Sequence, residues 1–290
     1  MAISDVKIFP PIGVARIGNS PDEWYIGPER PYEVVSPQGG YKDSECRIKR
    51  QVARFRLYGM DGNNEGMREL TSADGEITWT VHIANRKAHV TNSAATVVDP
   101  GARTIIGPLQ SAKFNTGTFS YTDGGTTYGP QNVDLGEIRS DVDGRLLVFG
   151  GFGTSFSPNP TVNANNPAGL HDYRWTDDVA DGYVNASIKL SDGTILNALS
   201  SWVIIGPPKY APAIRPVIDL WYLLFDLQGF TINDLPGYSS GKASFIQNIF
   251  PILDNSHKQI YVMGFPDSVH ASMDPYSGGF GNLAIPPSGG

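Results

Sequence analysis

Asp-Gly dipeptides recur along this chain, and they constrain its fold more than any other feature. Asp-Gly tolerates the positive φ angles that tight β-hairpins require, so each occurrence marks a candidate turn between two strands. Repeated turns of this kind predict many short antiparallel strands rather than long helices. The six occurrences are Asp61-Gly62, Asp74-Gly75, Asp123-Gly124, Asp143-Gly144, Asp181-Gly182 and Asp192-Gly193.

The segments around these dipeptides have strand patterns. EITWTVHIAN (residues 76–85) alternates, with Ile77, Trp79, Val81 and Ile83 on one face and threonine and histidine on the other. VARFRLYG (52–59) runs into the first dipeptide with Val52, Phe55 and Leu57 as its apolar positions, and residues 183–206 form the clearest hairpin. GRLLVFGG (144–151) is a continuous apolar run, which predicts a strand buried on both faces.

The opening stretch FPPIGVARIGNSPDEWYIGPE (9–29) is dense in proline and glycine. This density predicts a rigid, irregular segment in place of a strand or helix. Ile12, Val14 and Ile17 are expected to anchor it in a core, and Trp24 is expected to be buried. Arg16 is a candidate buried charge that donates to backbone carbonyls, in a structural rather than catalytic role.

Helix signals are confined to the last third of the chain. Residues 219–229 predict a short buried helix, and residues 244–253 predict a second one that Pro251 should kink or split. The expected fold class is therefore mostly β (α+β), with many short antiparallel strands and a few short helices near the C-terminus. Residues 1–215 are expected to form a mostly-β scaffold, and residues 216–290 a helical and loop segment continuous with it in one unit.

The charge and cysteine content exclude several classes of function. A net charge of −7 argues against nucleic acid and against an anionic membrane surface as partners. The single cysteine, Cys46, excludes an internal disulfide, and no signal peptide is visible at the start. The most apolar runs, SSWVIIGPP and IDLWYLLFDL, are too short to span a bilayer. We expect a soluble, cytoplasmic protein, with export by another route left open.

For two motifs, a structural role is a better interpretation than a catalytic or metal-binding role. Cys46 lies in the charged segment DSECRIKRQ without a G-x-S-x-G or cysteine-protease context, so a structural or incidental role is expected. DGNNEG (61–66) matches the first half of a calcium loop, but Ser72 occupies the twelfth position, where glutamate is required. A hairpin tip is the better interpretation of that segment, and we expect no metal.

The histidines supply the only candidates for acid–base chemistry. None of the five has zinc-motif spacing, and His82 is expected on the polar face of its strand. His257 and His270 lie in the tail close to three aspartates, where imidazole and carboxylate groups come together. We therefore take His257 and His270 as candidate catalytic residues, against the alternative of simply exposed loop histidines. The aspartates are Asp254, Asp267 and Asp274.

The basic segment RIKRQVARFR (47–56) alternates cations with apolar residues. It could face an anionic ligand. Pairing of its arginines with internal carboxylates or carbonyls is the interpretation that we favour.

Several segments, in collinear order, resemble the LodA-like enzymes. The resemblance starts with VKIFPPIGVARIGNSPDEWYIGPE, YKDSECRIKRQVARFRLYGMDGNN and RELTSADGEITWTVHIANRKA. It continues through VDLGEIRSDVDGRLLVFGGFGTS, DDVADGYVNASIKLSDG and SWVIIGPPKYAP, and it extends to DLWYLLFDL and SFIQNIFPIL. These are the L-lysine 6-oxidase and glycine oxidase group, which carries cysteine tryptophylquinone.

The resemblance implies an oxidase that deaminates an amino acid such as lysine or glycine and passes electrons to oxygen, giving hydrogen peroxide. It also implies that a flavoprotein matures the quinone from the enzyme's own cysteine and tryptophan. Members of the family are more than twice as long, however, and their cofactor residues lie in the second half. Neither Cys46 nor any of the five tryptophans matches them, so the resemblance assigns no cofactor and no catalytic residue to this chain.

Two functions follow from the resemblance. In the first, the chain is the N-terminal portion or subunit of an amino acid oxidase, with cysteine tryptophylquinone in a complementary C-terminal polypeptide. In the second, it is a stand-alone, non-catalytic binding or structural module derived from that half. The small-residue ending SGGFGNLAIPPSGG, which is typical of a chain cut at a loop, favours the first. Homo-oligomer formation and a new Cys46–tryptophan crosslink remain as minor alternatives.

Overall fold

The computed structural model describes residues 3–29, 33, 35–61, 67–162, 172–209, 220–227, 245 and 249–258. These residues belong to two compact units, Met1–Lys209 and Tyr210–Gly290. Strands make up nearly half of the described residues, and the described helices are few and short. The expectation of a mostly-β fold is confirmed. Whether the two units act as one stays a prediction.

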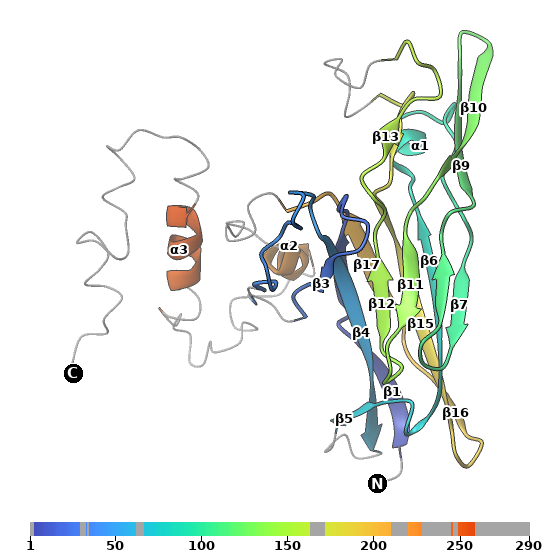
Figure 1. Cartoon of the computed structure of the whole chain (residues 1–290). Helices are drawn as coiled ribbons and strands as arrows, with labels where there is room; N and C mark the ends of the chain where they lie inside the picture. Colours follow the sequence, from blue (N-terminus) through green and yellow to red (C-terminus); the bar gives the residue numbers. More distant parts are fainter. Residues whose placement is uncertain are drawn as a thin grey trace, which may run out of the picture. The chain divides into compact units, whose positions relative to one another are not determined.

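One sheet of thirteen strands forms the body of the first unit (Figure 1). Its order is β7-β6-β15-β17-β2-β4-β12-β11-β8, while β1, β3 and β5 also pair with β4, and β16 pairs with β15. The end strands β7 and β8 contact each other, so the sheet wraps around its core. The strands are β1 Ile3–Phe9, β2 Ile12–Arg16, β3 Trp24–Ile26, β4 Arg50–Asp61, β5 Met67–Leu70, β6 Gly75–Ala84, β7 Arg103–Ile106, β8 Ser111–Lys113, β11 Glu137–Ser140, β12 Leu146–Phe149, β15 Ala180–Leu190, β16 Ile195–Asn197 and β17 Ser201–Gly206.

Smaller elements complete the first unit. β9 (Gly117–Asp123) pairs with β10 (Thr126–Val133) in a hairpin, and β13 (Ser155–Phe156) pairs with β14 (Thr176–Asp177). The short helix α1 (Lys87–Thr91) follows β6.

Most of the Asp-Gly dipeptides occupy turns, as predicted. Gly124, Gly144 and Gly193 have positive φ angles of 56°, 82° and 87°, which glycine adopts without a steric cost. β4 and β5 pair antiparallel and so form the predicted hairpin, although its tip at residues 62–66 lies outside the described residues. The calcium-loop alternative falls on that same undescribed segment.

The turn expected at Asp181-Gly182 was wrong, because both residues lie inside β15. They pair with Ala84 and Ile83 of β6 on one side and with β17 on the other. A Cβ atom on Gly182 would lie 1.8 Å from the carbonyl oxygen of His82. The glycine is therefore required for close approach of two backbones rather than for a turn.

The core contains the strand faces that the alternation predicted. Ile77, Trp79, Val81 and Ile83 of β6 are all buried, and the Trp79 indole N–H donates to the Gly144 carbonyl at 2.8 Å. All four residues of β12 are buried, as the continuous apolar run predicted. The largest fully buried side chains are Trp79, Tyr121, Phe55, Phe114, Phe119 and Phe149.

The first residues of β4, 50–53, are buried on both faces of the strand. Phe55 and Leu57 belong to the main core, whereas Val52 packs with Leu147 and Phe149 in a small second cluster. A strand with both faces covered can carry a charged side chain only if that charge finds a partner. This condition applies to the basic residues at the start of β4.

The opening stretch is more regular than its composition predicted. β2 and β3 both lie within it, and β2 pairs parallel with β17. Ile17 is buried, whereas Ile12 and Val14 are only partly so. Trp24 is 37% exposed, which contradicts the expected burial, although its ring makes an edge-to-face contact with Phe149 at 5.2 Å between ring centres.

Arg16 donates to a backbone carbonyl, as expected, but it is only partly buried. Its Nη1 donates to the Pro207 carbonyl at 2.9 Å, and burial lowers its pKa. Lys49 and Arg50, at the start of β4, are more deeply buried than Arg16.

The second unit contributes two described helices, α2 (Leu220–Leu227) and α3 (Phe250–Lys258). α2 confirms the first predicted helix, but Leu223, Leu224 and Leu227 are exposed rather than buried. The second helix was predicted over residues 244–253, whereas α3 begins at Phe250 and ends at Lys258. Pro251 therefore lies in the first turn of α3, where the backbone N–H that proline lacks is not needed, instead of kinking the helix. Residues 244 and 246–248 lie outside the described residues. None of the described helices is long and apolar enough to cross a membrane.

Candidate functional site

Two hollows flank the start of β4, one lined by Lys49 and the other by Arg50. The first, called here the Lys49 pocket, has a volume of about 680 Å³, and the second, the Arg50 cavity, about 240 Å³. Adjacent residues of an extended chain point to opposite sides, which explains why consecutive cations line different hollows.

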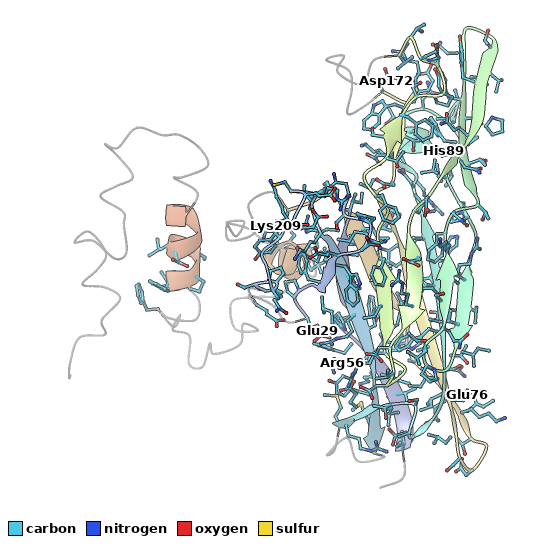
Figure 2. The ribbon with its side chains drawn as sticks, in the orientation of Figure 1. Glu29, Arg56, Glu76, His89, Asp172 and Lys209 are labelled. Atoms are coloured by element: carbon cyan, nitrogen blue, oxygen red, sulfur yellow. The ribbon has the colours of Figure 1, made fainter. Side chains whose placement is uncertain are left out.

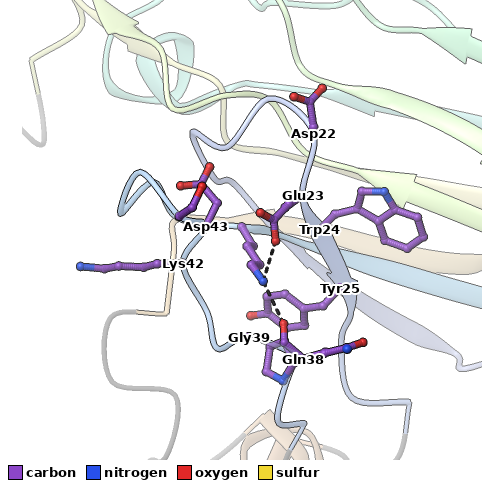
Figure 3. Close-up of a pocket in the computed structure, with 11 residues that line it drawn as sticks. Asp22, Glu23, Trp24, Tyr25, Gln38, Gly39, Lys42 and Asp43 are labelled. Atoms are coloured by element: carbon purple, nitrogen blue, oxygen red, sulfur yellow. Dashed lines mark hydrogen bonds and ion pairs between the residues drawn. The ribbon is translucent and has the colours of Figure 1, made fainter.

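The Lys49 pocket is built around an ion pair between a buried lysine, Lys49, and an exposed glutamate, Glu23 (Figure 3). Lys49 is only 5% exposed, and its Nζ lies 2.7 Å from the Glu23 carboxylate and donates to the Gln38 carbonyl at 2.9 Å. The ammonium is thus satisfied by a negative charge and a carbonyl, as a buried charge requires. The described lining residues are Asp22, Glu23, Trp24, Tyr25, Pro37, Gln38, Gly39, Lys42, Asp43, Ser44 and Lys49.

Asp43 holds the loop that forms one wall of this pocket. Its carboxylate accepts hydrogen bonds from the Ser20 hydroxyl at 2.8 Å, from the Arg47 side chain at 2.8 Å and from the backbone N–H groups of Glu45 and Arg47 at 2.9 Å. Burial acts to raise the pKa of Asp43, but these donors outweigh it and hold the pKa well below its usual range. The carboxylate is a structural anchor, and it is not available as a base.

Cys46 lies at the turn of the same loop. It is exposed and has a positive φ of 62°, so its predicted surface position is confirmed. Among the described residues, no cluster of His, Cys, Asp and Glu side chains that could hold a metal includes Cys46. The structural or incidental role expected of Cys46 stays a prediction.

The Arg50 cavity contains a more unusual charge. Arg50 is 2% exposed, and its guanidinium carbon lies 5.0 Å from the centre of the Phe149 ring and 4.4 Å from that of Phe152. Its Nη1 donates to the Gly150 carbonyl at 3.4 Å, and it lies 3.6 Å from the Glu137 carboxylate. Burial lowers the pKa of Arg50, while the Glu137 charge opposes that shift.

Two further cationic side chains line the same cavity, and one of them, Arg139, shares Glu137 with Arg50. Arg139 donates to Glu137 at 2.6 Å, and its guanidinium carbon lies 4.5 Å from the centre of the Phe149 ring. Lys113 and Asp134 complete the charged lining. The cavity is lined by Pro21, Arg50, Lys113, Asp134, Gly136, Glu137, Arg139 and Phe152.

The other arginines of the basic segment pair internally, which confirms the favoured interpretation for them. The Glu29 carboxylate receives the guanidinium groups of Arg54 and Arg56, with Arg54 Nη2 at 2.6 Å and Arg56 Nε at 3.0 Å (Figure 2). The Glu69 carboxylate likewise accepts hydrogen bonds from the guanidinium groups of Arg56 and Arg145. Burial acts to raise the pKa of Glu29, but the two arginines outweigh it and lower the pKa to about 2.

Two of the histidines have described hydrogen-bond partners, and the two candidate catalytic histidines do not have described side chains. His82 lies on the polar face of β6, as predicted, with its Nε2 2.8 Å from the Asp99 carboxylate. His89 pairs through Nδ1 with the Ala95 carbonyl. His257 lies on α3 with an undescribed side chain, and His270 lies outside the described residues, so their acid–base role stays a prediction. Among the described residues, no three His, Cys, Asp or Glu side chains gather as a metal site.

Sequence reasoning did not find the two hollows. The available signal was a pair of adjacent cations, Lys49 and Arg50, leading into a strand with apolar residues on both faces. Such cations must be buried with partners or against a ligand. The partners, Glu23, Gln38 and Glu137, are distant in sequence, so alternation alone could not identify them.

Comparison with known proteins decides the family. The family described as L-lysine epsilon oxidase N-terminal matches residues 9–97 and 89–205, which together cover more than half of the chain. The chain belongs to this LodA N-terminal family. The resemblance inferred from its motifs is thereby confirmed.

A curated relative of this LodA-family chain is the L-lysine 6-oxidase of Marinomonas mediterranea. It is 26% identical over 309 aligned positions, which cover 86% of this chain and 42% of the relative. The structure of the epsilon-lysine oxidase from the same organism matches with a TM-score of 0.67 and 24% identity, over 93% of this chain and 47% of that one. Its Schiff base intermediate with L-Lys matches with a TM-score of 0.66 at 24% identity, over 95% and 47%. The fold is therefore shared, and the chain spans less than half the length of these relatives.

Proposed function

We propose that this chain is the N-terminal portion or subunit of a LodA-like amino acid oxidase. The observation that carries the proposal is the family match over residues 9–205, together with coverage of only 42% of the L-lysine 6-oxidase. The complete enzyme would oxidatively deaminate an amino acid such as lysine or glycine, reducing oxygen to hydrogen peroxide. This chain would supply the β scaffold and one wall of the substrate pocket.

The quinone would come from the complementary half. Cysteine tryptophylquinone needs a cysteine and a tryptophan side by side, and none of the contacts described for Trp24, Trp79 and Trp202 is with Cys46. Cys46 is exposed on its turn, whereas Trp24, Trp79 and Trp202 contact Phe149, Gly144 and Asp181. We therefore assign no redox step to the described residues. A flavoprotein would be required to mature the complementary half.

Co-expression tests the division of labour. This chain, a polypeptide corresponding to the rest of the relatives' length and the flavoprotein should together release peroxide when lysine or glycine is added. Omitting this chain should abolish release, because the scaffold half would be missing, and so should omitting the quinone-bearing half. Peroxide release by this chain alone would contradict the proposal.

The intact mass of the purified chain should equal the mass calculated from the sequence. A Cys46–tryptophan crosslink or an oxygenated tryptophan would change that mass, and peptide mapping would then locate the change. The matched control is Cys46→Ser, whose mass should differ from that of the wild type by the single-atom exchange only. A modified tryptophan in the wild type that is absent from Cys46→Ser would place the quinone in this chain.

A stand-alone, non-catalytic module is the second candidate. The observation that favours it is the core of the first unit, which is continuous from Val6 to Ile205 within residues 1–209. A unit with its own core can in principle fold alone. Purification of the chain as a stable, folded monomer that binds no complementary polypeptide would support this function over the first.

A further inference from the structure

We propose that the Arg50 cavity binds a carboxylate group. The inference does not depend on the proposed function. Its ligand is a monoanionic carboxylate, supplied either by a free small acid or by an aspartate or glutamate side chain of another polypeptide segment.

The first argument is the incomplete hydrogen bonding of Arg50. A guanidinium has five N–H donors, yet the described structure gives Arg50 one hydrogen bond, to the Gly150 carbonyl at the long distance of 3.4 Å. Its Nε is buried without a partner, the only such side-chain atom among the described residues. Glu137 lies 3.6 Å away, which is an ion pair but too long for a hydrogen bond. Buried donors without acceptors are rare in folded proteins and need an explanation.

The second argument is charge. Arg50, Lys113 and Arg139 bring three positive charges to the lining, against the two carboxylates of Asp134 and Glu137. Arg139 donates a hydrogen bond to the Glu137 carboxylate at 2.6 Å, whereas Lys113 makes no ion pair with a described residue. The cavity thus has one positive charge in excess. A bound monoanion would make the site neutral. A phosphate dianion would leave the site with a net negative charge, which the two carboxylates would repel.

The third argument is shape and rigidity. The volume of about 240 Å³ accommodates a group of a few heavy atoms. Arg50 packs against Phe149 and Phe152, whose ring centres lie 5.0 Å and 4.4 Å from its guanidinium carbon. A guanidinium fixed by aromatic rings keeps its planar fork oriented, which favours planar, two-oxygen carboxylates over spherical ions.

The test measures binding to the full chain at constant ionic strength. Acetate is titrated against the ¹H–¹⁵N spectrum, with sodium chloride as the compensating salt, and N-acetyl-aspartate N-methylamide is titrated in parallel as a model of a side chain. We expect saturable shifts at Gly136, Glu137 and Gly150. If only acetate binds, the natural ligand is a free acid. If the blocked aspartate binds as tightly as acetate or more tightly, the natural ligand is a polypeptide side chain.

Variants decide whether Arg50 carries the site. Arg50→Met keeps the length and the aromatic contacts and should weaken acetate binding at least tenfold, which is about 1.4 kcal/mol. Arg54→Met, on the same strand but paired with Glu29, is the matched control and should bind like the wild type. If Arg50→Met does not fold, Lys113→Met at the exposed rim should still weaken binding severalfold with an unchanged melting temperature. Absence of saturable shifts, equal shifts with chloride in place of acetate, or unchanged affinity in the folded variants would overturn the proposal.

Discussion

Replacing Gly182 by alanine is expected to lower the free energy of unfolding by about 3 kcal/mol or more, because the new methyl group has no room. Its Cβ atom would lie 1.8 Å from the His82 carbonyl oxygen and 2.9 Å from the Ile83 Cα. Both atoms belong to the backbone of β6, so no side-chain rotation can relieve the overlap. The ladder between β15 and β6 would have to separate locally, and it is the longest pairing in the sheet.

Urea denaturation followed by tryptophan fluorescence measures this loss, with Trp79 as a buried reporter. Gly206→Ala is the matched control, because Gly206 also lies in a strand of the same sheet. It has ordinary φ, and its Cβ would meet only Arg16 Nη1 at 3.7 Å. The control should change stability by less than about 1 kcal/mol in either direction. Equal stability of the two variants would show that the β15–β6 approach is not as close as described.

Replacing Glu29 by glutamine should remove a stabilising contribution that depends on pH. The pKa of Glu29 in the folded state is about 2, below the ordinary value of 4.5, because the donors from Arg54 and Arg56 outweigh burial. A lowered pKa contributes stability that is fully present above pH 4.5 and is lost as the pH falls toward 2. At pH 7 the variant should be less stable by about 2 kcal/mol, since two partly buried guanidinium groups lose their shared carboxylate.

The free energy of unfolding is measured by urea titration at several pH values between 7 and 2. The wild type should lose more stability than Glu29→Gln between pH 4.5 and 2, by about 1–2 kcal/mol after solvent screening of a partly exposed network. Glu76→Gln, which alters an exposed carboxylate on β6, is the control and should follow the wild-type curve. Parallel curves for the wild type and Glu29→Gln would exclude Glu29 as a source of acid sensitivity.

Local pattern sufficed to predict much of the first unit. Alternation identified the buried face of β6, and the apolar run identified β12, because each depends on a two-residue period that is visible in any short window. Asp-Gly identified turns where glycine adopts a positive φ. It failed at Asp181-Gly182, where glycine serves the approach of a distant strand, and nothing local distinguishes the two uses.

The candidate hollows could not be predicted for a related reason. Lys49 depends on Glu23 and Gln38, and Arg50 on Glu137 and Gly150, so each environment is assembled from segments far apart in sequence. The opening stretch shows the same limit. Its prolines and glycines predicted irregular structure, yet pairing of β2 with β17 draws residues 12–16 into a regular strand. Tertiary pairing there overrides the local preference.

The pairing of β2 with β17 also sets the order in which the first unit can be completed during synthesis. Trp202 pairs with Ile12, so β2, which is synthesised early, cannot pair with β17 until the ribosome has added 190 more residues. At a typical ribosomal speed of 5–20 residues per second, the wait is roughly 10–40 s. Contacts of such long sequence separation form late and slow folding. Until β17 emerges, that edge of β2 is an unpaired strand edge, the kind of surface on which chaperones act and nascent chains aggregate.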